Sequence, residues 1–308
     1  MSPQYPAPGD TVRLTVSGDS TVDLANSAIT WLVNGKKVSQ DTGNTILDMK
    51  VGPLGKETSV DVRVAPPDGA DTSTSVVILP TQVDLLVDSD SYTPPFYEGR
   101  ALPSAGTQLH LQAIAHLKRT NGSSVPASAI TYTWRQNDRV VGSISGKGRQ
   151  SVTLPSPALY GTDTISVEAS SGDGLSGSAT VRISATEPVL VLYKDHPLFG
   201  IMYHQAMGDE TRIPDSEMTF AAVPYFAQIK NPNDPRLQYS WSVNDSDIQS
   251  NPGNPSEIIV NADNSSGLAT INLSLIHSNN FFMNAKGAWG VSFRTTGQTA
   301  NPFTSIFQ

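Results

Sequence analysis

The segment 192–204, LYKDHPLFGIMYH, gathers a lysine, an aspartate, two histidines and two tyrosines within thirteen residues. Imidazole nitrogens and carboxylate oxygens are common ligands of zinc. A zinc site here would need His196 and His204 to converge with a third ligand such as Asp195. No motif in the segment sets the geometry for that convergence, so the residue types raise the hypothesis of a metal site without establishing it.

The same segment also has a structural interpretation. Residues 188–193, PVLVLY, are typical of a strand, and Pro197 cannot donate to a β-ladder and restricts the backbone of His196. We therefore expect a strand that ends at His196-Pro197. A crossover should follow it, with apolar residues covering the edge of a core (Leu198, Phe199, Ile201 and Met202). We favour this interpretation over metal binding or catalysis.

Three aspartates in VDLLVDSDSY form a second candidate site. Asp84, Asp88 and Asp90 lie at the start of the second sequence repeat described below, and carboxylate oxygens at a domain junction suit Ca²⁺. Asp68 and Asp71, in APPDGAD, could approach from the preceding repeat. The segment lacks the glycine and the terminal glutamate of an EF-hand loop, and the alternative is a set of solvated turn carboxylates. Calcium is the one cofactor that the sequence suggests.

Other chemistry has weaker support. An internal Lys–Asn isopeptide bond would pair a lysine on an early strand with an asparagine on a late one, and Lys194 and Asn301 are the conceivable partners. The sequence contains no G-x-S-x-G elbow, H-E-x-x-H helix or P-loop. A pair of carboxylates for glycoside hydrolysis is defined by its three-dimensional geometry, so the sequence does not decide whether one exists. We expect a protein that is not an enzyme.

Composition narrows the class of protein. The 308 residues include no cysteine, 24 glycines and 22 prolines, and the net charge is -8. An acidic chain is a poor partner for nucleic acid. No apolar run is long enough for a transmembrane helix, and no signal peptide follows Met1. We interpret the opening MSPQYPAPGD as a linker after a start codon, and hence the chain as a fragment without its signal peptide and anchor. A cysteine-free multidomain β-protein points to a bacterial surface.

A repeat appears around three of the four tryptophans. Trp31, Trp134 and Trp241 lie in the phrases SAITWLVNG, SAITYTWRQND and LQYSWSVND, spaced by 103 and 107 residues. Apolar and polar residues alternate through each phrase, as in a strand that buries one face. Each phrase ends in a turn dipeptide, either Asn-Gly or Asn-Asp. A period near 100 residues is the size of one immunoglobulin-like sandwich.

Further alternating segments precede and follow each tryptophan in the same order. They are TVRLTV, QLHLQAIA and EMTFAAV before it, then TSVDVRV, DTISVEA and LATINLSLI, then STSVVILP, GSATVRIS and AWGVSFR. The sequence therefore predicts an all-β protein of three tandem Ig-like antiparallel β-sandwich domains, 1–81, 82–186 and 187–308. The first repeat lacks an obvious opening strand unless SPQYPAP supplies it. The tryptophans, Trp289 included, are better interpreted as core residues than as sugar-stacking platforms.

The segments SYTPPFYEGRALPSAGTQLHLQAIA and EPVLVLYKDHPLFG, with FAAVPYF and LQYSWSVN, resemble uncharacterised multi-Ig proteins of small-genome bacteria that are predicted to be surface-displayed. The resemblance spans essentially all 308 residues, and YTPPFYEGRALP is its most specific part. Each repeat is also loosely similar to the bacterial Ig-like and PKD-type modules of adhesins and surface stalks. The resemblance implies the fold and an extracellular location, and it transfers no catalytic residue.

The segment YTPPFYEGRALP has two interpretations. Its prolines favour an extended crossover, in which apolar residues would cap a sandwich edge (Tyr92, Phe96, Tyr97 and Leu102). The competing hypothesis is an exposed aromatic strip that binds a partner.

The sequence as a whole favours a non-enzymatic structural or adhesive stalk on a bacterial cell surface that holds a terminal element away from the envelope. The expected partners are neighbouring Ig-like domains of the parent chain and other surface proteins or glycans, with no nucleic acid and no membrane contact. Two alternatives stay open: a carbohydrate- or protein-binding recognition module, and accessory domains of a larger surface enzyme or pilus-associated protein.

Overall fold

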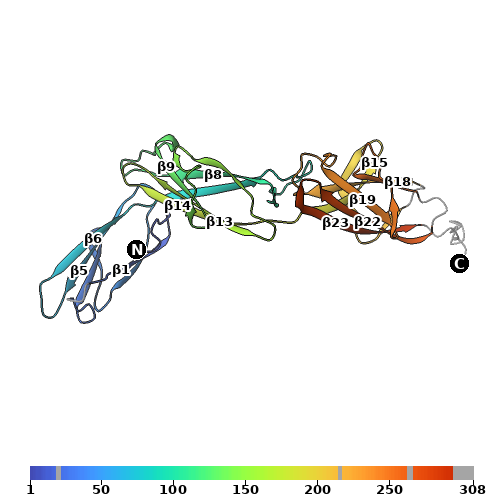
Figure 1. The fold of residues 1–308 in the computed structure, drawn as a ribbon. Helices are drawn as coiled ribbons and strands as arrows, with labels where there is room; N and C mark the ends of the chain where they lie inside the picture. Colours follow the sequence, from blue (N-terminus) through green and yellow to red (C-terminus); the bar gives the residue numbers. More distant parts are fainter. Residues whose placement is uncertain (19–21, 214–216, 262–265, 294–308) are drawn as a thin grey trace, which may run out of the picture. The chain divides into compact units, whose positions relative to one another are not determined.

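The computed structural model describes residues 1–18, 22–213, 217–261 and 266–293. These residues form β-strands joined by turns, with one 3₁₀ turn, η1 (Ala127–Ala129). None of the described helical turns is long and apolar enough to cross a bilayer. The strands make three successive groups, each of two sheets (Figure 1).

The first group has six strands. They are β1 (Thr11–Thr15), β2 (Ala28–Val33), β3 (Lys36–Thr42), β4 (Ile46–Lys50), β5 (Thr58–Ala65) and β6 (Thr72–Ile78). β1 pairs with β4, and the second sheet has the order β3-β2-β5-β6. Alternate residues of β1, β2 and β5 point into one core, because successive side chains of a strand face opposite sides. That core includes Val12, Ile29, Trp31, Val60 and Val62.

The second group has eight strands. They are β7 (Gln82–Ser89), β8 (Gln108–His116), β9 (Thr131–Gln136), β10 (Arg139–Val140), β11 (Gly146–Lys147), β12 (Ser151–Pro155), β13 (Thr162–Ser170) and β14 (Ser176–Ser184). The sheet orders are β12-β8-β7 and β10-β9-β13-β14, with β11 also paired to β9. Fully buried side chains again alternate along the strands, as in Leu109 and Leu111 of β8 and Tyr132 and Trp134 of β9.

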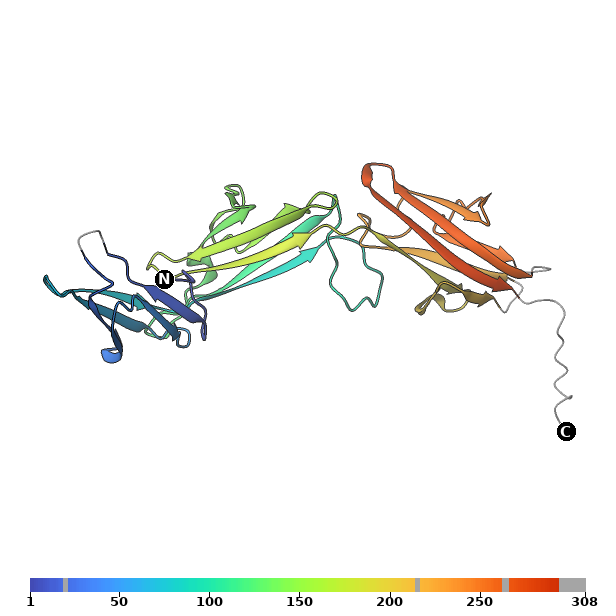
Figure 2. The same ribbon diagram turned by 90° about the horizontal axis from the view of Figure 1, so that it is seen from below.

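The third group has nine strands. They are β15 (Val189–His196), β16 (Gly200–Ala206), β17 (Thr211–Ile213), β18 (Glu217–Tyr225), β19 (Leu237–Val243), β20 (Ser246–Ile248), β21 (Glu257–Asn261), β22 (Gly267–His277) and β23 (Asn280–Phe293). The sheet orders are β16-β15-β18-β21 and β17-β23-β22-β19-β20. Figure 2 shows these two layers, with the long β22–β23 hairpin in orange and red. β17 pairs with β23 in parallel.

The strand order confirms the predicted fold class, three tandem Ig-like antiparallel sandwiches. In every group the tryptophan strand pairs with the next long strand, as β2 with β5, β9 with β13 and β19 with β22. Spatial contacts nevertheless divide the chain into two compact units, and one of them comprises Met1–Val87, Leu111–Thr153 and Asp163–Arg182. This division runs through the second group, so the boundaries 1–81, 82–186 and 187–308 stay a prediction.

The three repeated tryptophans have one structural role. Trp31, Trp134 and Trp241 are at most 2% exposed. Each indole Nε1–H donates to a backbone carbonyl of its own group: Asn44 at 3.1 Å, Arg149 at 2.9 Å and Pro255 at 3.0 Å. A buried indole needs such an acceptor. These side chains are core residues, and Trp289 also lies in the third core.

The turn dipeptides after the tryptophans adopt left-handed backbone conformations. Asn34, Asn137 and Asn244 have φ of 50°, 50° and 47°, and the glycine or aspartate after each also has positive φ. Two successive positive φ values define the type I′ turn that suits a two-residue hairpin. In each case the asparagine Oδ1 also accepts the backbone N–H of the neighbouring long strand, at Ser59, Thr164 and Thr270.

Candidate binding groove

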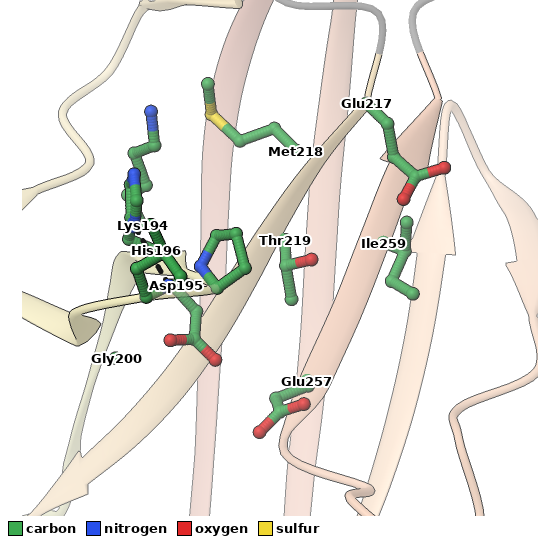
Figure 3. Close-up of a pocket in the computed structure, with 11 residues that line it drawn as sticks. Lys194, Asp195, His196, Gly200, Glu217, Met218, Thr219, Glu257 and Ile259 are labelled. Atoms are coloured by element: carbon green, nitrogen blue, oxygen red, sulfur yellow. Dashed lines mark hydrogen bonds between the residues drawn. The ribbon is translucent and has the colours of Figure 1, made fainter.

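An open groove of about 640 Å³ lies on the sheet β16-β15-β18-β21 of the third group (Figure 3). Asp195 on β15 pairs with Thr219 on β18, and Thr219 pairs with Ile259 on β21. The neighbouring row contains Phe220 and Ile258, which are buried in the core. Because successive side chains of a strand alternate between faces, the row from Asp195 to Ile259 faces away from the core and lines the groove.

Three carboxylates line the groove. Asp195 lies at one end, and Glu217 and Glu257 lie on β18 and β21 at opposite sides of Thr219 (Figure 3). Glu257 is oriented by Asn254, whose Nδ2 donates to Oε2 at 3.1 Å. Lys194 is the ammonium group among the lining residues. The groove is therefore a carboxylate-rich surface around a centre of threonine and isoleucine.

The hairpin between β15 and β16 forms one wall of the groove. The N–H of Leu198 donates to His196 Nδ1 at 3.1 Å, and the N–H of Phe199 donates to the His196 carbonyl. Gly200 has φ of 69°, which glycine adopts without a Cβ penalty. Because Nδ1 accepts a hydrogen bond, a neutral His196 keeps its proton on Nε2. The turn thus sets which imidazole nitrogen can donate to a ligand.

The prediction that the residues after Pro197 form a crossover covering a core edge is wrong. Residues Gly200–Ala206 form a strand that pairs with β15. Leu198 and Phe199 cover no core, since they are 83% and 74% exposed at the tip of the hairpin. The proline does end the strand as predicted, but a turn of proline and glycine reverses the chain immediately. The phenyl ring of Phe199 lies against the imidazole of His196, with 4.7 Å between ring centroids.

The zinc hypothesis gains no support from the neighbourhood of His196. His204 lies on β16 within the irregular stretch of the β15–β16 register, between Ile201 and Ala206. Within the described residues, no group of three or more histidine, aspartate or glutamate side chains could hold a metal ion. Of the pair suggested for an isopeptide bond, Lys194 lies on β15, and Asn301 lies outside the described residues.

The three aspartates of the calcium hypothesis have separate hydrogen-bond partners. Asp84 accepts from Gln82 Nε2 at 2.9 Å and lies 3.1 Å from His116 Nε2. Asp88 accepts the N–H of Ser89, and Asp90 accepts the N–H of Gln108 at 2.7 Å.

Strand geometry explains this separation. Asp84 and Asp88 lie four residues apart on β7, which in an extended strand is about 13 Å. Asp68 and Asp71 are exposed. A calcium ion on Asp84, Asp88 and Asp90 stays a prediction. Calorimetric titration with Ca²⁺ tests it, and the absence of heat at millimolar calcium would reject it.

The segment YTPPFYEGRALP contributes two tyrosines to the packing of the unit that contains the third group. The N–H of Tyr92 donates to the Ala227 carbonyl at 2.8 Å, and the N–H of Phe226 donates to the Tyr92 carbonyl at 2.7 Å. Tyr97 makes edge-on contacts with Tyr225 and Phe226. Its neighbour Phe96 is 90% exposed. The prediction that apolar residues of this segment pack as a cap thus holds for Tyr92 and Tyr97 and is wrong for Phe96.

Two tyrosine hydroxyl groups are hydrogen-bonded to each other close to this segment. Tyr193 and Tyr225 share a hydrogen bond of 2.6 Å between their Oη atoms, and Tyr203 packs edge-on against Tyr193. Burial raises the pKa of Tyr225 far above its usual value, and the bond with Tyr193 raises it further. Burial also raises the pKa of Tyr92 to about 12. The raised pKa values keep the phenols of Tyr225 and Tyr92 protonated at neutral pH.

The sequence predicts one wall of the groove and does not predict its other lining residues. His196 and Asp195 are candidate site residues in the sequence because they are adjacent along the chain. Glu217 and Glu257 come from strands that are distant in sequence, and their proximity depends on the pairing β15-β18-β21. Alternation of Met218 and Phe220 does predict that Glu217 and Thr219 share the outer face, but it does not say which strand lies beside them.

No protein-family model matches the sequence, and no curated protein matches it. Several solved structures are similar to this chain, with low TM-scores and low sequence identity. The fibronectin(III)-like modules of Clostridium thermocellum CbhA are 16% identical, covering 60% of this chain and 92% of that chain, with a TM-score of 0.28. The central fibronectin-III array of RIM-binding protein is 12% identical, covering 92% and 97%, with a TM-score of 0.32.

A third similar structure is SGBP-B of the Bacteroides ovatus mixed-linkage glucan utilization locus, solved with a mixed-linkage heptasaccharide. It is 11% identical, covering 94% of this chain and 66% of that chain, with a TM-score of 0.26. At these scores none of the similarities supports a functional argument. The class of protein, a tandem array of Ig-like sandwiches, rests on the strand order itself.

Proposed function

We propose that this chain is a non-enzymatic structural stalk, in which tandem Ig-like sandwiches outside a bacterial cell hold a terminal element away from the envelope. The supporting observation is that a tryptophan and a turn asparagine recur in equivalent positions with the same hydrogen bonds. In all three groups the tryptophan and the turn asparagine bind backbone atoms of their own sandwich. The most recognisable residues of the repeat therefore serve the stability of each sandwich, which is the property that a load-carrying spacer needs.

Single-molecule force spectroscopy on the intact chain tests the structural part of this proposal. Three independent sandwiches should unfold in three steps, each releasing roughly 300–400 Å of chain. Trp134→Ala should lower the force of one step and leave the other two unchanged, because Trp134 packs within the second group. A single cooperative step, or a variant that weakens all three steps, would contradict it. Antibody labelling of intact against permeabilised cells tests the location.

The groove favours a second function, recognition of a carbohydrate. Carboxylates accept hydrogen bonds from sugar hydroxyls, and Asp195, Glu217 and Glu257 surround the groove centre. Phe199 lies beside the groove, in the hairpin turn and against the lining residue His196, and its exposed ring leaves a face for stacking. A glycan array would identify the ligand. Glu257→Gln and Phe199→Ala should then lose binding, while Phe281→Ala, which removes a ring that is 90% exposed on β23, should retain it. An array without a hit would remove this function.

A further inference from the structure

The β22–β23 hairpin contains a bulge next to its turn (its two strands are orange and red in Figure 2). The register shifts between Ile276 and His277, which leaves residues 281–283 of β23 without a partner on β22. Phe281 and Phe282 in this bulge are 90% and 56% exposed, and their rings lie edge-on with centroids 6.0 Å apart. Ile276 on the facing strand is 47% exposed. A bulge re-aims side chains, and exposed apolar side chains that gather in this way commonly mark an interaction site.

Hydrogen bonds hold the turn that precedes the two rings. Asn280 Nδ2 donates to the Ala105 carbonyl and to Gln228 Oε1, each at 2.8 Å. The N–H of Phe282 donates to Asn280 Oδ1 at 3.2 Å. Both rings therefore project from a backbone that is already held in place. Little conformational entropy is lost when such side chains bind a partner.

The charge of the hairpin differs from that of the chain. Residues 267–293 contain no aspartate or glutamate, although the chain has 28 of these residues and a net charge of -8. The lysine of this segment, Lys286, makes no ion pair with the described residues. Beside the turn the N–H of Ser278 donates to the Arg236 carbonyl, and there the carboxylate of Asp234 is 6% exposed and bound by the Arg236 guanidinium. The exposed end of the hairpin therefore presents apolar and neutral polar groups with one cation behind them.

Lys286 also lines a shallow depression of about 540 Å³ on the outer face of the same sheet. The paired residues Ser240, Ser274 and Lys286 form a row across β19, β22 and β23, and Asn272 lines the depression from the next row. Hydroxyl, amide and ammonium groups all donate hydrogen bonds to phosphate oxygens. Asp247 lines the opposite side on β20, three strand spacings or about 14 Å from β23. This carboxylate is too distant to neutralise the ammonium group.

We propose that this hairpin binds the surface of a phospholipid bilayer. Phe281 and Phe282 enter the boundary between headgroups and acyl chains, while Lys286 and the neighbouring hydroxyl groups bind lipid phosphate. Lys286 is four residues beyond Phe282, at most about 14 Å along the strand, and the flexible stem of a lysine lets its ammonium group reach the headgroups. Buried apolar area and attraction to anionic lipids are the two contributions that hold a protein in this interface.

A lipid surface fits these observations better than a folded partner. A folded partner would need an apolar pocket shaped for two adjacent rings, whereas the headgroup boundary accepts apolar side chains in any arrangement. A carboxylate at this end would repel lipid phosphate and would be costly to desolvate, and the hairpin has none. The expectation of no membrane contact rested on the lack of a transmembrane run, and a hairpin in the interface needs no such run.

Sedimentation of the full chain with unilamellar vesicles tests the proposal. The vesicles contain equal parts of phosphatidylcholine and phosphatidylglycerol at physiological ionic strength, and the unmodified chain should bind them. The double variant Phe281→Ser/Phe282→Ser should bind about tenfold or more weakly, because two rings no longer leave water. The double variant Phe96→Ser/Phe199→Ser is the matched control, since it removes rings that are 90% and 74% exposed outside the hairpin, and it should bind normally. All four rings are exposed, so unchanged melting temperatures confirm that both variants fold.

Two further pairs of variants test the phosphate contact and the insertion. Lys286→Gln should weaken vesicle binding by about fivefold, whereas Lys147→Gln, which removes an exposed lysine of β11, should not. Phe281→Trp adds an exposed indole whose emission should shift to the blue on vesicles, and Phe96→Trp should show no shift. Absence of vesicle binding, or an equal loss in the two double variants, overturns the proposal. A glycan that binds the chain without vesicles and is lost in Phe281→Ser/Phe282→Ser would assign the rings to sugar stacking and also overturn it.

Discussion

Asn244 and Thr270 join the tryptophan strand β19 to β22 by two reciprocal hydrogen bonds. The backbone N–H of Asn244 donates to the Thr270 carbonyl at 3.0 Å, and the backbone N–H of Thr270 donates to Asn244 Oδ1 at 2.9 Å. The side chain of a turn residue thereby continues the β-ladder by one bond. Because the turn requires a positive φ, asparagine meets both demands, since it tolerates this conformation and carries an acceptor on a short side chain.

Two substitutions at Asn244 distinguish the stability contributed by the side-chain acceptor from that contributed by the backbone conformation. Asn244→Gly keeps the left-handed conformation and loses the acceptor, and should lower the free energy of unfolding by about 1 kcal/mol. Asn244→Ala loses both and should cost about 1–2 kcal/mol more. Asn244→Asp retains an acceptor and is the control. Denaturant unfolding measures all three, and equal stability of the glycine and alanine variants would contradict the role of φ.

Much of this fold could be predicted because its signals are local. Alternation around Trp31, Trp134 and Trp241 indicates a strand with one buried face, and the Asn-Gly and Asn-Asp dipeptides indicate the turn that follows. The hydrogen bond from each indole is less accessible to sequence reasoning. Its acceptors, such as Arg149 and Pro255, lie 14 or 15 residues further on and contribute only a backbone carbonyl.

The groove could not be predicted because it depends on strand neighbours. Glu257 lines the groove since β21 pairs with β18. The segment after Pro197 illustrates a different limit. An apolar run such as Leu198-Phe199 predicts a core segment, but it lies in the three-residue turn 197–199 between paired strands, where both side chains face solvent.

Phe96 occupies a turn position that normally requires glycine. The N–H of Tyr97 donates to the Pro94 carbonyl at 3.3 Å, and Phe96 has φ of 67° with its ring 90% exposed. Phe96→Gly should therefore raise the free energy of unfolding by about 0.5 kcal/mol, since relief of strain exceeds the greater entropy of the unfolded chain. Thermal unfolding by calorimetry measures the change.

Tyr160 provides the matched comparison for this turn. It has φ of 60° and is 79% exposed, but its hydroxyl donates to Glu187. Tyr160→Gly should gain less than Phe96→Gly, because it relieves the same strain and loses a hydrogen bond. A loss of stability in Phe96→Gly would mean that the exposed ring has a packing role.

The tyrosine pair predicts a loss of stability at alkaline pH. The pKa of Tyr225 is raised from 10.0 by burial and by its bond with Tyr193. A raised pKa means that the folded state holds its proton more tightly than the unfolded state. Its contribution is therefore complete below about pH 10 and is lost as the pH rises toward the folded pKa.

Urea unfolding from about pH 9 to about pH 12, with tyrosinate absorbance as the titration signal, checks this prediction. Tyr225→Phe should be less stable at neutral pH, because Tyr193 loses its partner, and should show a shallower alkaline decline. An unchanged decline would assign the alkaline transition to other phenols, of which Tyr92, with a pKa raised to about 12, is the first to examine.

His277 predicts a separate loss of stability in mild acid. It is 5% exposed at the end of β22, its Nδ1 accepts the N–H of Asn279 at 3.1 Å, and its Nε2 is buried without a hydrogen-bond partner among the described residues. Burial lowers its pKa from 6.5, and the nearby Arg236 lowers it further, whereas Asp234 opposes the shift. The unfolded state therefore binds a proton first as the pH falls below about 6.5, and stability declines from that point.

His277→Leu should flatten the dependence of the melting temperature on pH between about pH 7 and about pH 5, because leucine does not titrate. A second decline below about pH 4 should persist in this variant. It comes from Asp234, whose pKa is lowered by hydrogen bonds from the Arg236 guanidinium at 2.6 and 2.8 Å and whose contribution is lost when the carboxylate is protonated. The persistent second decline shows that the variant still folds around the Asp234–Arg236 pair. A slope between pH 7 and 5 equal to that of the unmodified chain would assign the mild-acid transition to a group other than His277.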